Sequence, residues 1–226
     1  MKKILLITIP ILMIGILYFM LNSTKKKADS DLGGLDKQMN PDYKNEPLFD
    51  EKIYGKSFYE EKAGEIYKDD GFLSYEEIVK RVESGRMNLV WELWSLRRQC
   101  PPDYSPSQCN MLILAMIEKN FSPPGGTKLA NLFKGYVEYE KEARELQLSQ
   151  KDSVTPFAER YEMIKKKRRE VFKDERDIEF VFGLEESKVD FIQKSQKFLE
   201  ETKNKSGEER VKGYNKLKEE TYGQYL

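Results

Sequence analysis

The chain contains no histidine among its 226 residues. Imidazole is the commonest general base near neutral pH and a frequent metal ligand, so its absence excludes every catalytic triad or dyad that uses it. The sequence also lacks a G-x-S-x-G motif, a P-loop and a dinucleotide fingerprint. The adjacent carboxylates at 185–186 and 200–201 point to different helix faces, and we expect them to be solvated. We predict no catalytic residue, no metal ligand and no cofactor, and a protein that is not an enzyme. A hydrolase built on two distant carboxylates is the remaining enzymatic alternative.

Cysteine is almost as scarce, since only Cys100 and Cys109 occur, at the two ends of the stretch CPPDYSPSQC. This spacing fits neither a C-x-x-C redox pair nor a zinc site, which would need two more ligands. Pro101, Pro102 and Pro106 stiffen the stretch into a turn that would hold the thiols close together. A disulfide between Cys100 and Cys109 would close a short loop and contribute about 2–3 kcal/mol in an oxidising compartment. Two reduced thiols at helix ends are the alternative.

Net charge is absent too, because 39 Lys and Arg residues balance 39 Asp and Glu residues while 35% of the chain is charged. Such dense, balanced charge is typical of solvated helices. The KKKRR run at 165–169 would grip phosphates in a nucleic-acid-binding protein. Four glutamates (159, 162, 170 and 175) flank this run, most of them close enough on a helix to pair with it. We interpret the run as a solvated helix face and expect no nucleic-acid partner.

One long apolar run is present, over residues 4–21. At ~1.5 Å per residue it forms a helix of about 27 Å, close to the ~30 Å hydrocarbon thickness of a bilayer. No small residues suited to signal cleavage follow the run directly. We therefore predict an uncleaved single-pass anchor over residues 1–24. Lysines stand on both sides of the run, so charge bias alone leaves its orientation open. The two cysteines favour a body outside the cytoplasm.

The rest of the chain carries only helical patterns, which predicts an all-α protein. Residues 25–70 are polar, with scattered aromatics, and we expect a flexible stalk. Docking of these aromatics onto the body is the alternative. Residues 71–122 predict a small helical minidomain, and residues 126–226 an extended helical domain. The expected helices begin at Ser74 as N-cap, near Arg86, at Ser107, at 127, at Thr155-Pro156 and after Gly207. Between the last two we expect short helical pieces around Phe180 and Phe182, then a helix over 189–198.

Trp91 and Trp94 stand three residues apart on one predicted helix, beside Arg86 and the pair Arg97-Arg98. Tryptophan and arginine are enriched at the energetic centres of protein interfaces. Burial of both indoles in a small helical core is the alternative. The long helix at 127–150 carries only a narrow apolar stripe, from 129 to 146, on a charged rod. These features favour a binding protein whose core a partner completes.

Two segments resemble the lipase-specific foldases, or lipase chaperones, a family of membrane-anchored periplasmic proteins. Residues 160–191 (RYEMIKKKRREVFKDERDIEFVFGLEESKVDF) contain a helix with paired arginines and then FGLEE at 182–186. Residues 131–143 (NLFKGYVEYEKEA) are similar to the long helix of that family. The resemblance covers about 110 residues. Arg86, Leu89 and Trp91 match the beginning of the family's R-x-x-F-D-Y-F-L-S-A-L-G-E signature, after which the register is lost. We also expect the second minidomain of the family to be missing or cut to one helix.

The resemblance implies a steric chaperone in the cell inner membrane, with its body in the periplasm, that helps to fold a secreted lipase or similar hydrolase. An extended helical clasp would bind this client without covalent chemistry. A structural or adaptor protein of the envelope is the alternative. We expect the client to contact Arg86, Leu89, Trp91, Trp94 and Ser95. Phe180, Phe182 and the stripe at 129–146 would form a groove or its internal packing.

Overall fold

The computed structural model describes residues 47–225, except 51, 53, 69–71 and 150–155. The anchor predicted over residues 1–24 and the first part of the predicted stalk, up to residue 46, lie outside the described residues. None of the helices within 47–225 is long and apolar enough to cross a membrane.

The described part of the chain is helical and has no strand, which confirms the all-α class for these residues. In chain order its elements are α2 (Lys56–Ile66), α3 (Tyr75–Glu83), α4 (Leu89–Arg98), α5 (Pro106–Asn120), α6 (Gly125–Ser149), α7 (Phe157–Val171), α8 (Glu175–Glu201), α9 (Gly207–Tyr222) and the short 3-10 turn η3 (Gly223–Tyr225).

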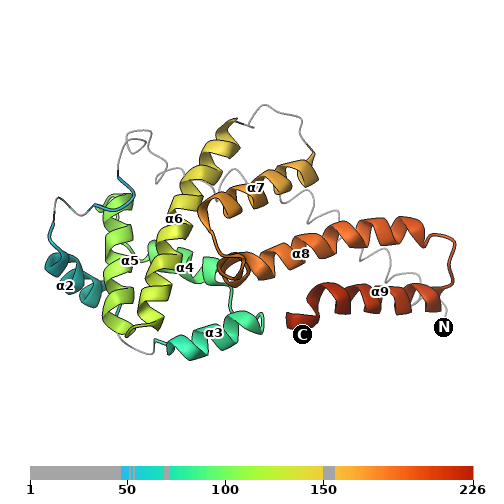
Figure 1. Ribbon diagram of the computed structural model, residues 1–226, viewed down its shortest axis with the longest axis horizontal. Coiled ribbons are helices and arrows are strands. Elements are labelled where there is room, and N and C mark those ends of the chain that lie inside the picture. The colour runs from blue at the N-terminus through green and yellow to red at the C-terminus, as the bar shows by residue number, and fades with distance from the viewer. Residues whose placement is uncertain (1–46, 51, 53, 69–71, 150–155, 226) are drawn as a thin grey trace, which may run out of the picture. The chain divides into compact units, whose positions relative to one another are not determined.

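Helix α5 lies at the centre of the core, between α2, α4 and α6 (Figure 1). Every residue from Cys109 to Ile117 is buried, so this helix has no exposed face over more than two turns. A helix that is mostly apolar on all sides is stable in water only when other elements surround it. Helix α6 covers one side with the buried residues Leu129, Ala130, Leu132, Phe133, Tyr136, Val137 and Tyr139. This is a broad buried face rather than the narrow stripe that the sequence predicted.

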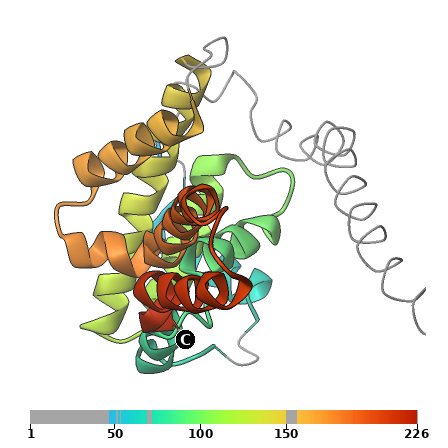
Figure 2. The same ribbon diagram turned by 90° about the vertical axis from the view of Figure 1, so that its right-hand side faces the viewer.

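The core ends within α8, because Phe182 is the last of its buried apolar residues. Helix α8 continues past this point and α9 runs back along it, forming a hairpin (Figures 1 and 2). The Phe191 ring holds the two helices together through Tyr214 and Tyr222, at centroid distances of 5.7 and 5.1 Å. No residue of α9 is buried. The hairpin therefore depends on a few aromatic contacts.

Several predicted helix boundaries hold and others do not. Ser74 caps α3 as predicted, since its Oγ accepts from the Glu77 N–H. Helix α5 begins earlier than predicted, because Ser105 rather than Ser107 is the N-cap and forms a capping box with Gln108. The short pieces predicted around Phe180 and Phe182 are one continuous helix, α8, which passes through Gly183. Thr155, the predicted cap of α7, lies outside the described residues, and Pro156 stands at the N-cap position.

The predicted flexible stalk is wrong for its second part. Helix α2 packs on α5, and Tyr59, Ala63 and Tyr67 are buried members of the core. The stalk prediction followed from the many polar residues of this segment. The position of α2 is instead determined by its few aromatic and small residues, which are the ones buried in the core. Residues 71–122 and 126–182 also share this core, so the expected division at 122–126 is not a boundary between two cores.

Arg168 joins α7 to α8 and is only 2% exposed, although it lies in the KKKRR run. Its Nη1 and Nη2 donate to Glu186 at 2.9 Å and to Glu185 at 2.5 Å. The guanidinium also lies 4.0 Å above the Phe182 ring. Burial alone would lower the pKa of Arg168, but neighbouring Tyr139 and the two carboxylates outweigh it and raise this pKa. Arg168 is therefore a buried cation whose charge is balanced by two carboxylates, while its Nε has no hydrogen-bond partner among the described residues.

These contacts correct two predictions at once. Glu185 and Glu186 do not point away from each other into solvent, because both bind the same guanidinium. The solvated interpretation holds for other members of the run, since Lys165 pairs with Glu162 and Arg169 with Glu175. Arg168 is the exception.

Replacing Arg168 by Ala should lower the free energy of unfolding by about 3 kcal/mol, because breaking a buried ion pair leaves charges without compensation. Chemical denaturation would measure this. The matched control is Arg169→Ala, which removes an exposed ion pair and should cost less than about 1 kcal/mol. Equal losses in the two variants would contradict the assigned role of Arg168.

Tyr59 offers a pH-dependent test of the position of α2. Its hydroxyl has no hydrogen-bond partner among the described residues, and burial, helped by nearby Asp50, raises its pKa from 10.0 to about 12. The fold thus favours the neutral phenol, so this stabilisation is complete below about pH 10 and is lost as the pH rises towards 12. Denaturation at pH 8 should find Tyr59→Phe at least as stable as the wild type. Between pH 10 and 12, the free energy of unfolding of the variant should fall less than that of the wild type. A large loss at pH 8 would show that the hydroxyl is bonded.

Candidate partner-binding surface

Helix α4 carries most of the residues that the sequence singled out for binding, and its inner face is packed into the core. Asn88 caps it, since its side-chain oxygen accepts from the Trp91 N–H at 3.2 Å. Leu89 and Leu93, one helical turn apart, are both buried. At the other end, the Tyr67 hydroxyl of the segment after α2 donates to the Leu96 carbonyl at 3.2 Å. These contacts determine which side of α4 faces inward.

A polar network strengthens the same face. Arg97 forms an ion pair with Glu140 of α6 and donates to the Asn110 side chain of α5 at 3.1 Å. Asn110 in turn donates to the Leu48 carbonyl at 2.9 Å, and Tyr136 donates to Glu140 at 2.6 Å. One guanidinium thus connects α4, α5 and α6, and the segment before α2 is joined through Asn110.

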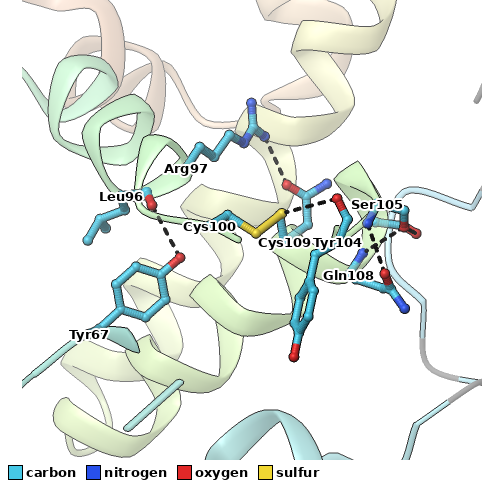
Figure 3. Close-up of a disulfide and its surroundings, with 10 residues drawn as sticks. Tyr67, Leu96, Arg97, Cys100, Tyr104, Ser105, Gln108 and Cys109 are labelled. Carbon is cyan, nitrogen blue, oxygen red and sulfur yellow. Dashed lines mark hydrogen bonds between the residues drawn. A yellow bond between two sulfur atoms is a disulfide. The ribbon is translucent and has the colours of Figure 1, made fainter. Parts of the chain in front are cut away.

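A disulfide joins Cys100, just after α4, to Cys109 in α5, with the two Cα atoms 5.9 Å apart. Figure 3 shows it close to Arg97, with the Ser105–Gln108 capping box at the start of α5. The loop between α4 and α5 is therefore closed at its base by a covalent bond. Both ends of α4 are fixed, one by the Asn88 cap and the buried Leu89, the other by Arg97 and the disulfide.

The outer face of α4 presents Trp91, Trp94, Ser95 and Arg98, which we call the tryptophan surface. These positions follow the i, i+3, i+4, i+7 spacing of one helix face. Trp91 is 64% exposed, the highest value among the large apolar side chains of the described residues. Its ring meets the half-buried Trp94 edge to face, at a centroid distance of 5.6 Å. An exposed indole pair of this kind has a large apolar area available to a partner.

Arg98 completes this surface, because its guanidinium lies 4.9 Å from the centroid of the Trp94 ring. The arginine side chain is exposed, and no carboxylate of the described residues forms an ion pair with it. Its N–H donors are therefore open to solvent or to a bound group. We did not select Arg98 from the sequence, although its position four residues after Trp94 is a recognisable signal for stacking on a helix.

The structure brings together only part of the predicted binding set. Trp91, Trp94 and Ser95 share the tryptophan surface. Leu89 is wrong as a surface contact, since it is 6% exposed and packs inward. Arg86 is exposed in the link before α4, where its Nε donates to the Ser84 hydroxyl at 2.9 Å, and none of the described cation–π contacts joins it to the indoles.

The two predicted phenylalanines lie elsewhere. Phe182 is 1% exposed and forms part of the aromatic packing around Arg168, which makes it a core residue rather than part of a groove. Phe180 is half-buried on the other side of α8 and packs against the core. Both residues belong to α8 and pack against the core, and neither belongs to the tryptophan surface.

The part of the chain that the structure describes offers no cluster of metal ligands. No group of three or more Cys, Asp or Glu side chains there could hold a metal ion. The arrangement that α4 presents instead is apolar, aromatic and cationic. Chemically, such a surface can bury apolar side chains and bind an anion.

The chain was compared with known proteins in three ways. It matches no protein-family model, and it matches neither a curated protein nor a solved structure.

Replacing both cysteines by Ser should lower the free energy of unfolding by about 2–3 kcal/mol, because the unfolded chain is no longer restrained by the closed loop. Denaturant titration followed by tryptophan fluorescence measures this in α4 itself, since Trp91 and Trp94 are the only tryptophans of the chain. A reducing agent should shift the wild type to the same midpoint and leave the double variant unchanged. A reductant effect on the variant would show that the shift has another cause.

Proposed function

We propose that this chain is a membrane-anchored binding protein that works outside the cytoplasm and captures a protein client through the tryptophan surface, without covalent chemistry. The observation that carries this proposal is the 64% exposure of Trp91 beside Trp94 on a helix whose inner face is fixed. An indole that contributes little to the core is explained by a partner that covers it. Tryptophan is also among the residues most enriched at interface hot spots.

The location rests on one sequence feature and one structural feature. The apolar run at 4–21 has the length of a membrane anchor. The disulfide between Cys100 and Cys109 is the kind of bond that persists in oxidising compartments. Together they support an inner-membrane protein with its body in the periplasm.

The resemblance to lipase-specific foldases supplies a client class, a secreted lipase or a similar hydrolase. In such a mechanism the chaperone binds the near-native form of the client more tightly than its collapsed alternatives. A difference of about 1.4 kcal/mol in binding free energy shifts the population of these forms about tenfold. The structure modifies the expected geometry, because residues 47–182 share one core and do not form separate rods around a client.

Capture of a client from detergent-solubilised native membranes is the first test of the proposal. Trp91→Ala and Trp94→Ala should each weaken capture by about thirtyfold or more, since truncating a hot-spot tryptophan costs about 2 kcal/mol or more. Phe157→Ala is the matched control, because this exposed aromatic lies on α7 and should leave capture unchanged. Far-UV circular dichroism must remain that of the wild type. A loss of helicity in the tryptophan variants would identify both indoles as core residues.

Refolding of a secreted lipase from denaturant distinguishes a foldase from an adaptor. The full chain in detergent should raise the yield of active lipase, and Trp94→Ala should abolish most of this gain while Phe157→Ala preserves it. Capture of a client without any gain in its refolding would support the structural or adaptor role instead. Absence of both capture and refolding would contradict the proposed function.

A further inference from the structure

The aromatic rings of the described residues hold four cations within stacking distance: Arg97 over Tyr136, Arg98 over Trp94, Lys165 over Tyr161, and Arg168 over Phe182, Tyr139 and Tyr161. Three of these cations also bind carboxylates. Arg97 pairs with Glu140, Lys165 with Glu162, and Arg168 with Glu185 and Glu186. Only Arg98 has no such partner within the described ranges.

The difference follows from the chemistry of the guanidinium group. An aromatic face binds one side of the planar cation, and the N–H donors at its edge remain to be satisfied. In the interior, the two Nη groups of Arg168 satisfy their N–H donors with two carboxylates, at 2% exposure of the residue. At the surface, water satisfies them around Arg98. Covering the tryptophan surface with a partner would remove this water, and the partner must then supply an acceptor.

We infer that the tryptophan surface recognises an acidic–apolar segment of a protein client, in which a carboxylate binds Arg98 while an apolar side chain packs on Trp91. This inference rests on the proposed function and names the chemistry of the client at that surface. A carboxylate is favoured over a neutral acceptor, because two parallel N–H···O bonds form between guanidinium and carboxylate and such charge-assisted bonds are about twice as strong as neutral ones.

Helix geometry sets the spacing of the two contacts. Trp91 and Arg98 are seven residues apart, which is about 10 Å along the axis of α4 at ~1.5 Å per residue. The Arg98 side chain reaches back over the Trp94 ring, so its guanidinium lies closer to Trp91 than this backbone spacing. In an extended peptide, successive side chains point to opposite faces, and side chains two positions apart share one face at a separation of about 6.6 Å. The matching segment therefore has an apolar residue followed two positions later by Asp or Glu. Ser95 lies between the two contacts, on the same face, and its exposed hydroxyl can bond to the peptide backbone.

The test uses intrinsic fluorescence, because Trp91 and Trp94 are the only tryptophans and both lie in the surface. The probe is a blocked hexapeptide of Ser and Thr with Phe at its second position and Glu at its fourth, titrated into the full chain in detergent micelles. Two matched peptides carry Gln or Lys in place of Glu. We expect the Glu peptide to change the emission with a half-saturating concentration at least fivefold lower than the Gln peptide and tenfold lower than the Lys peptide. The preference should shrink as salt is raised.

Arg98→Met isolates the charge, since it keeps an unbranched side chain over Trp94. This variant should lose the preference for Glu over Gln, while Arg169→Met on α7, whose arginine is exposed but already paired, should retain it. Equal affinity for the Glu and Gln peptides, tighter binding of the Lys peptide, or no emission change with any peptide would each overturn the inference. Client capture from membranes is measured in a separate experiment from the peptide titration. Capture that depends on Trp91 but not on Arg98 would reject the acidic segment and leave the proposed function standing.

Discussion

The position of α4 depends on Arg97, whose single guanidinium contacts Glu140 of α6 and Asn110 of α5. A partly buried arginine is tolerated only when its donors are satisfied, so these bonds allow little freedom in how α4 is rotated about its axis. Leu89, Leu93 and Arg97 follow one another at four-residue spacing and share the inward side of α4. Trp91 and Arg98 lie on the opposite side of the helix and are exposed, whereas Trp94 lies between the two sides and is half-buried. The exposure of Trp91 is thus a consequence of which side of α4 the leucines and Arg97 hold inward.

Arg97 and Arg98 are adjacent in sequence and have opposite surroundings. The first stacks on Tyr136 and holds a carboxylate in the interior, and the second stacks on Trp94 at the surface without one. Arg168 repeats the interior arrangement between α7 and α8. The same combination of ring, cation and carboxylate therefore connects helices inside the protein. On the surface of α4, the ring of Trp94 and the cation of Arg98 are present, and no carboxylate of the described residues completes the combination.

Local rules predicted much of the helical structure. The Ser74 cap, the break between α5 and α6, and the helix after Gly207 all follow from residues close in sequence. The predictions that were wrong concern contacts between residues that are distant in sequence. Nothing local distinguishes Phe182, which is buried under Arg168, from an exposed phenylalanine. The pairing of Glu185 and Glu186 with one arginine needs α7 and α8 to cross at a particular place. Likewise, the position of α2 depends on its packing against α5, which buries Tyr59.

Fixing the inner face of α4 also affects how well its outer face can bind. A side chain on a mobile segment must lose backbone freedom when a partner covers it, and this loss reduces affinity. Helix α4 has lost that freedom on folding, through the Asn88 cap, the buried leucines, the Arg97 network and the disulfide. Only side-chain rotations remain to be restricted, and the Trp94 ring is already held between Trp91 and Arg98. The four devices that hold α4 in place therefore also lower the entropic cost of binding at the tryptophan surface.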